Sequence, residues 1–367
     1  MKLRISFLLP FLLFACTLNR LFTFPIDKFF ILGTCLVLLY QQKTISRKSI
    51  RLLLIVIAVL LITFFVNSLS FSFLLLFPLI GLLFVVLLVR DTDNKQYLYY
   101  GLWWHIFLGL LLVIYSYIQP YTFLDDYVHY MYDKGMPFLH ASMGFTPTVQ
   151  TFGTMCLAWL LLYVHKRSYK LTTFIDRFML FIVILGICVT FNRNTFVMLI
   201  FTTFFHFKKF FYLFFFTVVA GVIYYYDVIK SLVLNVNTLN SRISGLEGFQ
   251  NSYIESNSLI VYLFGRGDNN VWNTQYTQNP LIENGIAAML HSFGFVGFLV
   301  YGIIGGVLVS LLLANKKWFL SFFLFYILFI QQIFTTELYN GTFYIIVASI
   351  LLTSGLLNKK NKTTLEI

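Results

Sequence analysis

Residues 286–317 read IAAMLHSFGFVGFLVYGIIGGVLVSLLLANKK, an apolar run closed by a pair of lysines. No Asp, Glu, Lys or Arg interrupts this run before Lys316. A helix needs about 20 consecutive apolar residues to cross the hydrocarbon of a bilayer, and its basic end usually faces the cytoplasm. The stretch therefore predicts a membrane-spanning helix with Lys316 and Lys317 on the cytoplasmic side.

Similar apolar runs, separated by short polar breaks, fill the rest of the chain. Of its 367 residues, 59% are hydrophobic, and the mean hydropathy is +0.83. This composition predicts an all-α, polytopic integral membrane protein: one transmembrane domain over residues 1–367, with about twelve helices and both termini in the cytoplasm. The expected spans are 5–18, 29–41, 52–66, 69–89, 97–118, 148–164, 176–191, 195–207, 210–226, 286–313, 318–333 and 342–357.

The charges divide between the two sides of this predicted topology. Nineteen of the 26 Lys and Arg residues fall on the cytoplasmic side, whereas ten of the 14 Asp and Glu residues fall outside. This distribution is the positive-inside bias of membrane proteins. It explains the net charge of +12 by membrane anchoring, so we expect a lipid bilayer as partner and no nucleic acid.

The four cysteines and the N-terminus favour an integral protein without disulfides. Cys16, Cys35, Cys156 and Cys188 all lie inside apolar runs, so we expect neither a disulfide nor a thiolate metal site. The first apolar run lacks a convincing small-residue cleavage site. We interpret it as a retained span rather than a signal peptide.

Two long breaks, 119–147 and 227–285, are expected on the extracytoplasmic side. Long loops in compact proteins often carry function. In the first, Asp125, His129 and Asp133 recur every four residues beside Asp126, a pattern that fits either a metal or acid–base face on a short helix or, more simply, a solvated acidic loop.

Three arginines stand among the few basic residues of the outer face. Arg193 lies in the connection Phe191-Asn192-Arg193-Asn194, where the next helix begins, and Arg242 and Arg266 lie in the second long loop. A guanidinium binds phosphate oxygens in a bidentate manner, and a helix N-terminus favours anions. The three residues are therefore candidates for a diphosphate site; the alternatives are snorkelling at the headgroups for Arg193 and solvated loop cations for the other two.

Glu283 and His291 are the candidate acid–base residues. Glu283 stands at the outer mouth of the long helix, and positions 283, 287 and 291 share one helical face. An acid at a helix start also favours the helix dipole, and an intramembrane His can be a hydrogen-bonded core residue. Glu337, between the last two spans, is another outer acid that fits a turn cap.

Three motifs in this order resemble the O-antigen polymerase and ligase superfamily. FNRNTFVMLI is similar to its Ser-Arg-Gly element before an apolar helix, and SRISGLEGF with YLFGRGD is similar to its large-loop pattern. ENGIAAMLHSFGFVG resembles the next element, which begins His-Asn in ligases and ends Gly-apolar-apolar-Gly. Asn192 and Asn194 replace the Ser and Gly of the first motif. Glu283 at the ligase His position favours a polymerase of the Wzy type.

The resemblance implies a GT-C-like membrane glycosyltransferase of the bacterial cytoplasmic membrane, multi-pass and without cofactor or obligatory metal. Its substrate would be an undecaprenyl-diphosphate-linked oligosaccharide, polymerised outside the cytoplasm into O-antigen, capsule or exopolysaccharide, with a chain-length regulator as a possible partner. Arg193, Arg242 and Arg266 would hold the diphosphate, and Glu283 would accept the proton of the attacking hydroxyl.

Two other functions remain open from the sequence. One is a ligase-type transfer of finished glycan to another acceptor, which the missing His at position 283 disfavours. The other is a lipid-linked oligosaccharide flippase or transporter, a non-enzyme. Transporters place charges near the bilayer midplane and often show related halves, whereas here the candidate charges lie at the outer rim and no internal repeat is visible.

Overall fold

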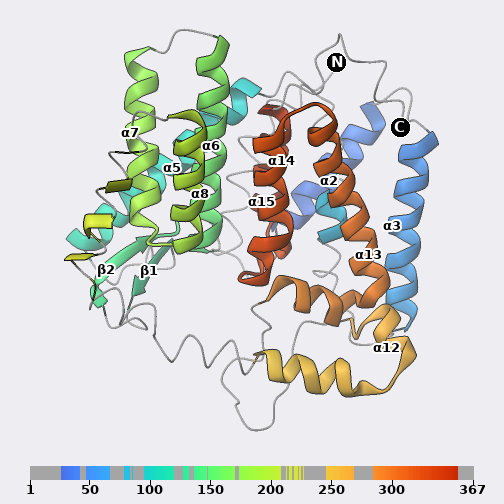
Figure 1. The fold of residues 1–367 in the computed structure, drawn as a ribbon. Helices are drawn as coiled ribbons and strands as arrows, with labels where there is room; N and C mark the ends of the chain where they lie inside the picture. The colour runs from blue at the N-terminus through green and yellow to red at the C-terminus, as the bar shows by residue number, and fades with distance from the viewer. Residues whose placement is uncertain are drawn as a thin grey trace. The chain divides into compact units, whose positions relative to one another are not determined.

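The computed structural model describes residues 26–41, 47–66, 78–82, 85, 95–119, 127–131, 136–146, 148–169, 173–207, scattered positions between 212 and 226, 245–267 and 284–353. These residues are mostly helical (Figure 1). Contacts divide the chain into two units, Met1–Leu98 with Arg242–Ile367 and Tyr99–Ser241. The expected spans 5–18, most of 69–89 and much of 210–226 lie outside the described residues.

The unit from 99 to 241 is built on four helices and a hairpin. The helices are α5 (Lys95–Ile118), α6 (Val149–Tyr169), α7 (Phe174–Val189) and α8 (Arg193–His206). α6 is the central helix, because residues 151–163 are all buried. A Cβ built on Gly153 of α6 would lie 2.2 Å from Oγ1 of Thr195, so this glycine lets α8 approach α6 closely.

A β-hairpin occupies the first long break, where we had considered a short helix. β1 (Val128–Met131) pairs antiparallel with β2 (Met136–Ser142), with a register shift between Tyr130 and Met131. The short-helix interpretation is wrong for His129, which lies in β1, because β-branched and aromatic neighbours favour a strand. Asp125, Asp126 and Asp133 lie outside the described residues.

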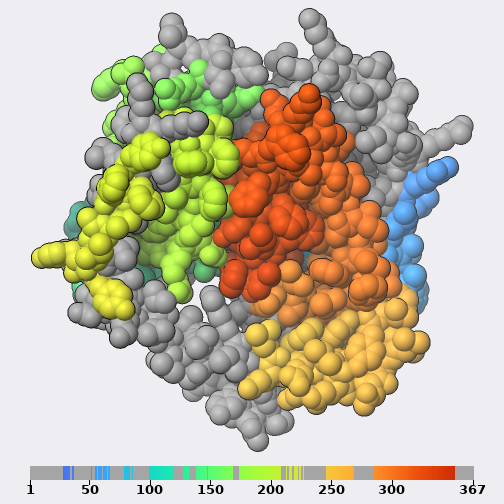
Figure 2. Space-filling view, viewed as in Figure 1, coloured from blue at the N-terminus to red at the C-terminus, as the bar shows by residue number. Residues whose placement is uncertain are grey.

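The other unit contains the long helix predicted first. Its helices are α2 (Ile26–Gln41), α3 (Arg47–Val66), α12 (Leu259–Phe264), α13 (Gly285–Ala314), α14 (Trp318–Phe325) and α15 (Gly341–Thr353), with a helical stretch at 245–252. α14 continues through a π-helical turn, Tyr326–Ile330, into the 3-10 turn Gln331–Ile333, and a second 3-10 turn spans Glu337–Tyr339. Residues 245–267 lie directly against α13 (Figure 2).

The helices coincide with nine of the expected spans, which confirms the helical prediction there. Among the described residues, Tyr99–Ile118 and Gly285–Ala314 are long and apolar enough to cross a membrane. Trp318–Ile333 and Gly341–Leu351 are apolar but shorter. A mostly helical chain with two such helices is thus established, and the full count of crossings stays a prediction.

α13 is broken at Gly294, which has non-helical angles of φ 64° and ψ −168°. The break divides it into a short arm, 285–293, and a long arm, 295–314, which run in different directions (Figure 1). The short arm does not continue the axis of the long arm. His291 consequently belongs to a separate, short helix rather than to a straight span.

Candidate functional site

The short arm of α13 ends against the loop that follows α12. The backbone N–H of Arg266 donates to the carbonyl of His291 at 2.7 Å, and that of Gly267 donates to the carbonyl of Ser292 at 3.1 Å. The last carbonyls of a helix have no partner within it. These two bonds therefore close the end of the short arm with backbone groups of the loop.

Two glycines allow this contact. A Cβ on Gly294 would lie 2.4 Å from the carbonyl carbon of Leu263 and the nitrogen of Phe264, and a Cβ on Gly265 would lie 2.5 Å from the carbonyl carbon of Ser292. Both glycines also have positive φ, 64° and 73°. L-residues with side chains rarely adopt that region. The LFGRG and SFG stretches thus pack backbone against backbone.

Ser252 connects Arg266 with His291. Its carbonyl accepts a hydrogen bond from Nε of Arg266 at 2.7 Å, and its Oγ lies 3.0 Å from Nε2 of His291. His291 is 1% exposed, Ser252 is half-buried and Arg266 is exposed. The three residues therefore form a path of polar groups from the interior to the surface, which runs through both the hydroxyl and the carbonyl of Ser252.

The surrounding loop is held by aromatic contacts. Tyr253 stacks on Phe249 with ring centroids 5.2 Å apart, and its hydroxyl donates to the carbonyl of Tyr262 at 2.8 Å. Burial raises the pKa of the Tyr253 phenol above its usual value, so the group stays a neutral donor. Phe249 also packs against Ala287 and Ala288 of the short arm.

The start of α13 is fixed on its other side. Asn284 is the N-cap, and its Oδ1 accepts from the N–H groups of Ile286 and Ala287 at 3.0 Å. The N–H of Gly285 donates to the carbonyl of Thr335 at 2.9 Å. The Asn of the Glu283-Asn284 pair thus has a structural role, and Glu283 itself lies outside the described residues.

A polar cluster of amides and one acid lies at the same end. Glu337 is 1% exposed, and its Oε2 accepts from Nε2 of Gln331 at 2.9 Å. Oε1 of Gln332 accepts from the N–H of Leu338 at 3.3 Å, and a Cβ on Gly285 would lie 3.1 Å from this oxygen. Glu337 is therefore a buried acid whose side chain accepts a hydrogen bond from a glutamine amide. The sequence had suggested only a turn cap at this position.

Arg193 is the first residue of α8, as the sequence predicts. The cap is Asn192, whose Oδ1 accepts from the N–H of Asn194 at 3.0 Å. Asn is among the favoured N-cap residues, as Ser is, so an asparagine suits this position. Arg193 is exposed, and Phe191 turns the chain with a φ of 48°.

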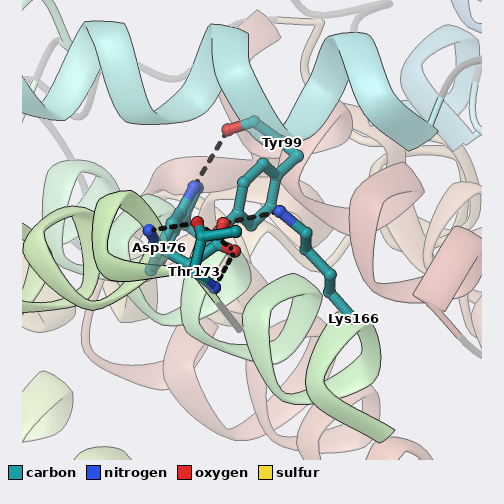
Figure 3. A network of polar contacts seen from close by, with 5 residues as sticks. Tyr99, Lys166, Thr173 and Asp176 are labelled. Atoms are coloured by element: carbon teal, nitrogen blue, oxygen red, sulfur yellow. Dashed lines mark hydrogen bonds and ion pairs between the residues drawn. The ribbon is translucent and has the colours of Figure 1, made fainter. Parts of the chain in front are cut away.

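A second polar network holds α5, α6 and α7 together. Asp176, 2% exposed, accepts from Nζ of Lys166 at 2.5 Å, from the hydroxyl of Tyr99 at 3.1 Å and from Thr173 (Figure 3). Tyr99 stacks on Trp159. Thr173 and Asp176 also form a capping box for α7. Every member is engaged in holding helices, so we interpret this network as structural.

The structure brings together two of the five candidate site residues, Arg266 and His291. Arg193 belongs to the other unit, and Arg242 and Glu283 lie outside the described residues. Within the part of the chain that the structure describes, no group of three or more His, Cys, Asp or Glu residues has a metal-site arrangement.

Sequence reasoning missed Ser252, Gln331 and Gln332. The two adjacent glutamines in the apolar stretch ILFIQQIF were a usable signal, because polar side chains within an apolar helix usually have partners. Nothing local distinguishes Ser252 from the other serines of its loop. Its role depends on a contact with a residue 39 positions later.

Comparison with protein-family models and with curated proteins finds no match to this chain, so its resemblance to the polymerase and ligase superfamily depends on the three motifs and their order.

Proposed function

We propose that the chain is a membrane glycosyltransferase that polymerises undecaprenyl-diphosphate-linked repeat units into a surface polysaccharide on the extracytoplasmic face. One observation supports this proposal above the others. The YLFGRGD and HSFGFVG stretches, singled out as successive motifs, pack against each other, and Arg266 and His291 lie next to Ser252 at their junction. Separate motifs that build one polar site are expected of an enzyme rather than of scattered loop charges.

In the proposed reaction, the acceptor is the non-reducing end of a lipid-linked repeat. Its hydroxyl oxygen attacks the anomeric carbon of the growing glycan, and the bond from that carbon to the diphosphate oxygen breaks. Arg266, with Arg193 and Arg242 as further proposed ligands, would offset the charge that develops on the leaving diphosphate. Glu283 would accept the hydroxyl proton.

Substitution of the proposed base tests the activity. Glu283→Gln is expected to lower the polymerisation rate by about 10²–10⁴-fold, the usual contribution of a general base. Arg193→Ala is expected to shorten or abolish the polymer, because a diphosphate ligand is lost. Chain length is measured on gels after incubation of purified protein with lipid-linked repeats. Arg177→Ala, an exposed arginine in α7, is the control. Full-length polymer from both site variants would dismiss the assignment.

The proposed topology has its own test by cysteine labelling. In a variant without native cysteines, Glu255→Cys should react with a membrane-impermeant maleimide on intact cells, whereas Lys317→Cys should react only after permeabilisation. Both positions are exposed, so a difference in labelling reports the side of the membrane. Equal labelling of both in detergent is the control. Labelling of Lys317→Cys in intact cells would reverse the orientation.

A further inference from the structure

Ser252 lies between a buried histidine, His291, and an exposed arginine, Arg266. His291 is buried, so it has no open route to a substrate at the surface. Ser252 is half-buried and lies 3.0 Å from Nε2 of His291 through its Oγ. The Ser252 hydroxyl therefore offers a route by which His291 can act on a molecule bound at the surface.

The same serine also sets the position of Arg266. The Ser252 carbonyl accepts from Nε of Arg266, and the N–H of Arg266 is bonded to the His291 carbonyl. Arg266 is thereby fixed at its backbone by His291 and at Nε by Ser252, which places the guanidinium beside the serine. An arginine that is fixed in this way loses little entropy when it binds an anion.

From these contacts we propose that Ser252 is a diphosphate-binding residue and that His291 is a positioning residue that orients its hydroxyl. In this arrangement Nε2–H of His291 donates to Oγ of Ser252, and the hydroxyl of Ser252 donates to a phosphate oxygen next to Arg266. Hydrogen bonds to a charged acceptor are stronger than those to a neutral one. This inference depends on the proposed function for its substrate, and it adds two named roles to it.

The chemical step needs no proton from His291. When the bond between the anomeric carbon and the diphosphate oxygen breaks, the electron pair stays on that oxygen. The hydrogen bond from Ser252 to the diphosphate then strengthens together with the contact of Arg266. The proton of the attacking hydroxyl goes to Glu283, as in the proposed function, so His291 keeps the same protonation state throughout.

Binding to the full-length protein in lipid nanodiscs tests the proposal, with inorganic diphosphate and undecaprenyl diphosphate as separate probes. Ser252→Ala is expected to weaken the binding of both probes by about tenfold or more, the value of one hydrogen bond to a charged group. Ser252→Thr keeps the hydroxyl and should bind within about threefold of the wild type. Ser256→Ala is the matched control, because the Ser256 hydroxyl donates to the nearby carbonyl of Tyr253. Wild-type affinity in Ser252→Ala overturns the proposal, and so does a loss limited to undecaprenyl diphosphate.

The role of His291 is tested with a substitution that keeps a donor. His291→Gln retains an N–H at a similar distance from the backbone and should bind diphosphate nearly as well as the wild type, whereas His291→Leu should match Ser252→Ala. The KM for the lipid-linked repeat should rise in His291→Leu in parallel with its loss of diphosphate binding. If His291→Gln binds as weakly as His291→Leu, the positioning role is refuted.

These measurements separate the inference from the proposed function. A wild-type protein that binds diphosphate through Ser252 but makes no polymer contradicts the polymerase proposal alone. A wild-type protein that makes polymer, with Ser252→Ala unchanged in both binding and KM, contradicts the role of Ser252 alone.

Discussion

Gly294→Ala is expected to abolish polymer formation and to lower the free energy of unfolding by about 2–4 kcal/mol, from steric overlap and an unfavourable positive φ. The new methyl group would lie 2.4 Å from backbone atoms of Leu263 and Phe264, which cannot rotate away as a side chain can. The loop would have to separate from α13, and Arg266 would then lose its place beside Ser252 and His291. SDS titration in mixed micelles measures the stability, and gel analysis of the product measures the activity.

Two glycines of the long arm provide the matched control. Gly302 and Gly306 lie in regular helix, and a Cβ at either position would meet nothing within 4 Å. Gly302→Ala and Gly306→Ala are therefore expected to be neutral or to stabilise by about 0.5–1 kcal/mol through helix propensity. If Gly294→Ala behaves like these two variants, the break in α13 does not hold the site together.

Asp176→Asn is expected to destabilise the protein by about 2–3 kcal/mol, because it removes one partner of a largely buried charge pair. The carboxylate accepts four hydrogen bonds, from Lys166, Tyr99 and twice from Thr173. An asparagine replaces one carboxylate oxygen with an NH2 group, which cannot accept these hydrogen bonds. It also leaves Lys166 without its counter-charge. The side chain of Lys166 is 30% exposed, so water compensates in part, and the loss is smaller than for a fully buried pair.

Two further variants test whether the loss is specific to the Asp176–Lys166 pair. Arg177→Ala, at an exposed position next to Asp176, should change stability by no more than about 0.5 kcal/mol. Lys166→Met combined with Asp176→Asn should lose less than the sum of the two single losses, because the lysine is no longer left unpaired. Wild-type stability in Asp176→Asn would show that the network does not hold α5, α6 and α7.

Local features of the chain predicted the helices well. A span is recognised by its own apolar length, so it can be read from neighbouring residues, whereas the orientation inferred from the basic residues stays a prediction. The start of α8 at Arg193 was also predictable, because a polar break between apolar runs marks a helix end. The N-cap roles of Asn192 and Asn284 became clear only from the structure.

The remaining features of the fold and of the site are not local. Gly294 lies in an apolar run in which glycine is compatible with a continuous helix, and the contact with Leu263 and Phe264 is what requires the break. The hairpin at 128–142 depends on the pairing of two short segments, and the Ser252–His291 contact joins residues 39 positions apart. The motifs singled out Arg266 and His291 separately, whereas packing alone showed that they meet and identified the serine between them.

The break in α13 also indicates how deep Gly294 lies in a bilayer. At 1.5 Å per residue, the long arm from 295 to 314 is about 30 Å long. This length equals the thickness of the hydrocarbon core of a bilayer. On the proposed topology, the break at Gly294 then lies at the boundary between acyl chains and headgroups. A polyprenyl carrier presents its pyrophosphate at the same level. Lipids with longer tails would draw the break inward and shorter ones would push it outward. If the proposed function holds, membrane composition would thereby set how well the site reaches a lipid-linked substrate.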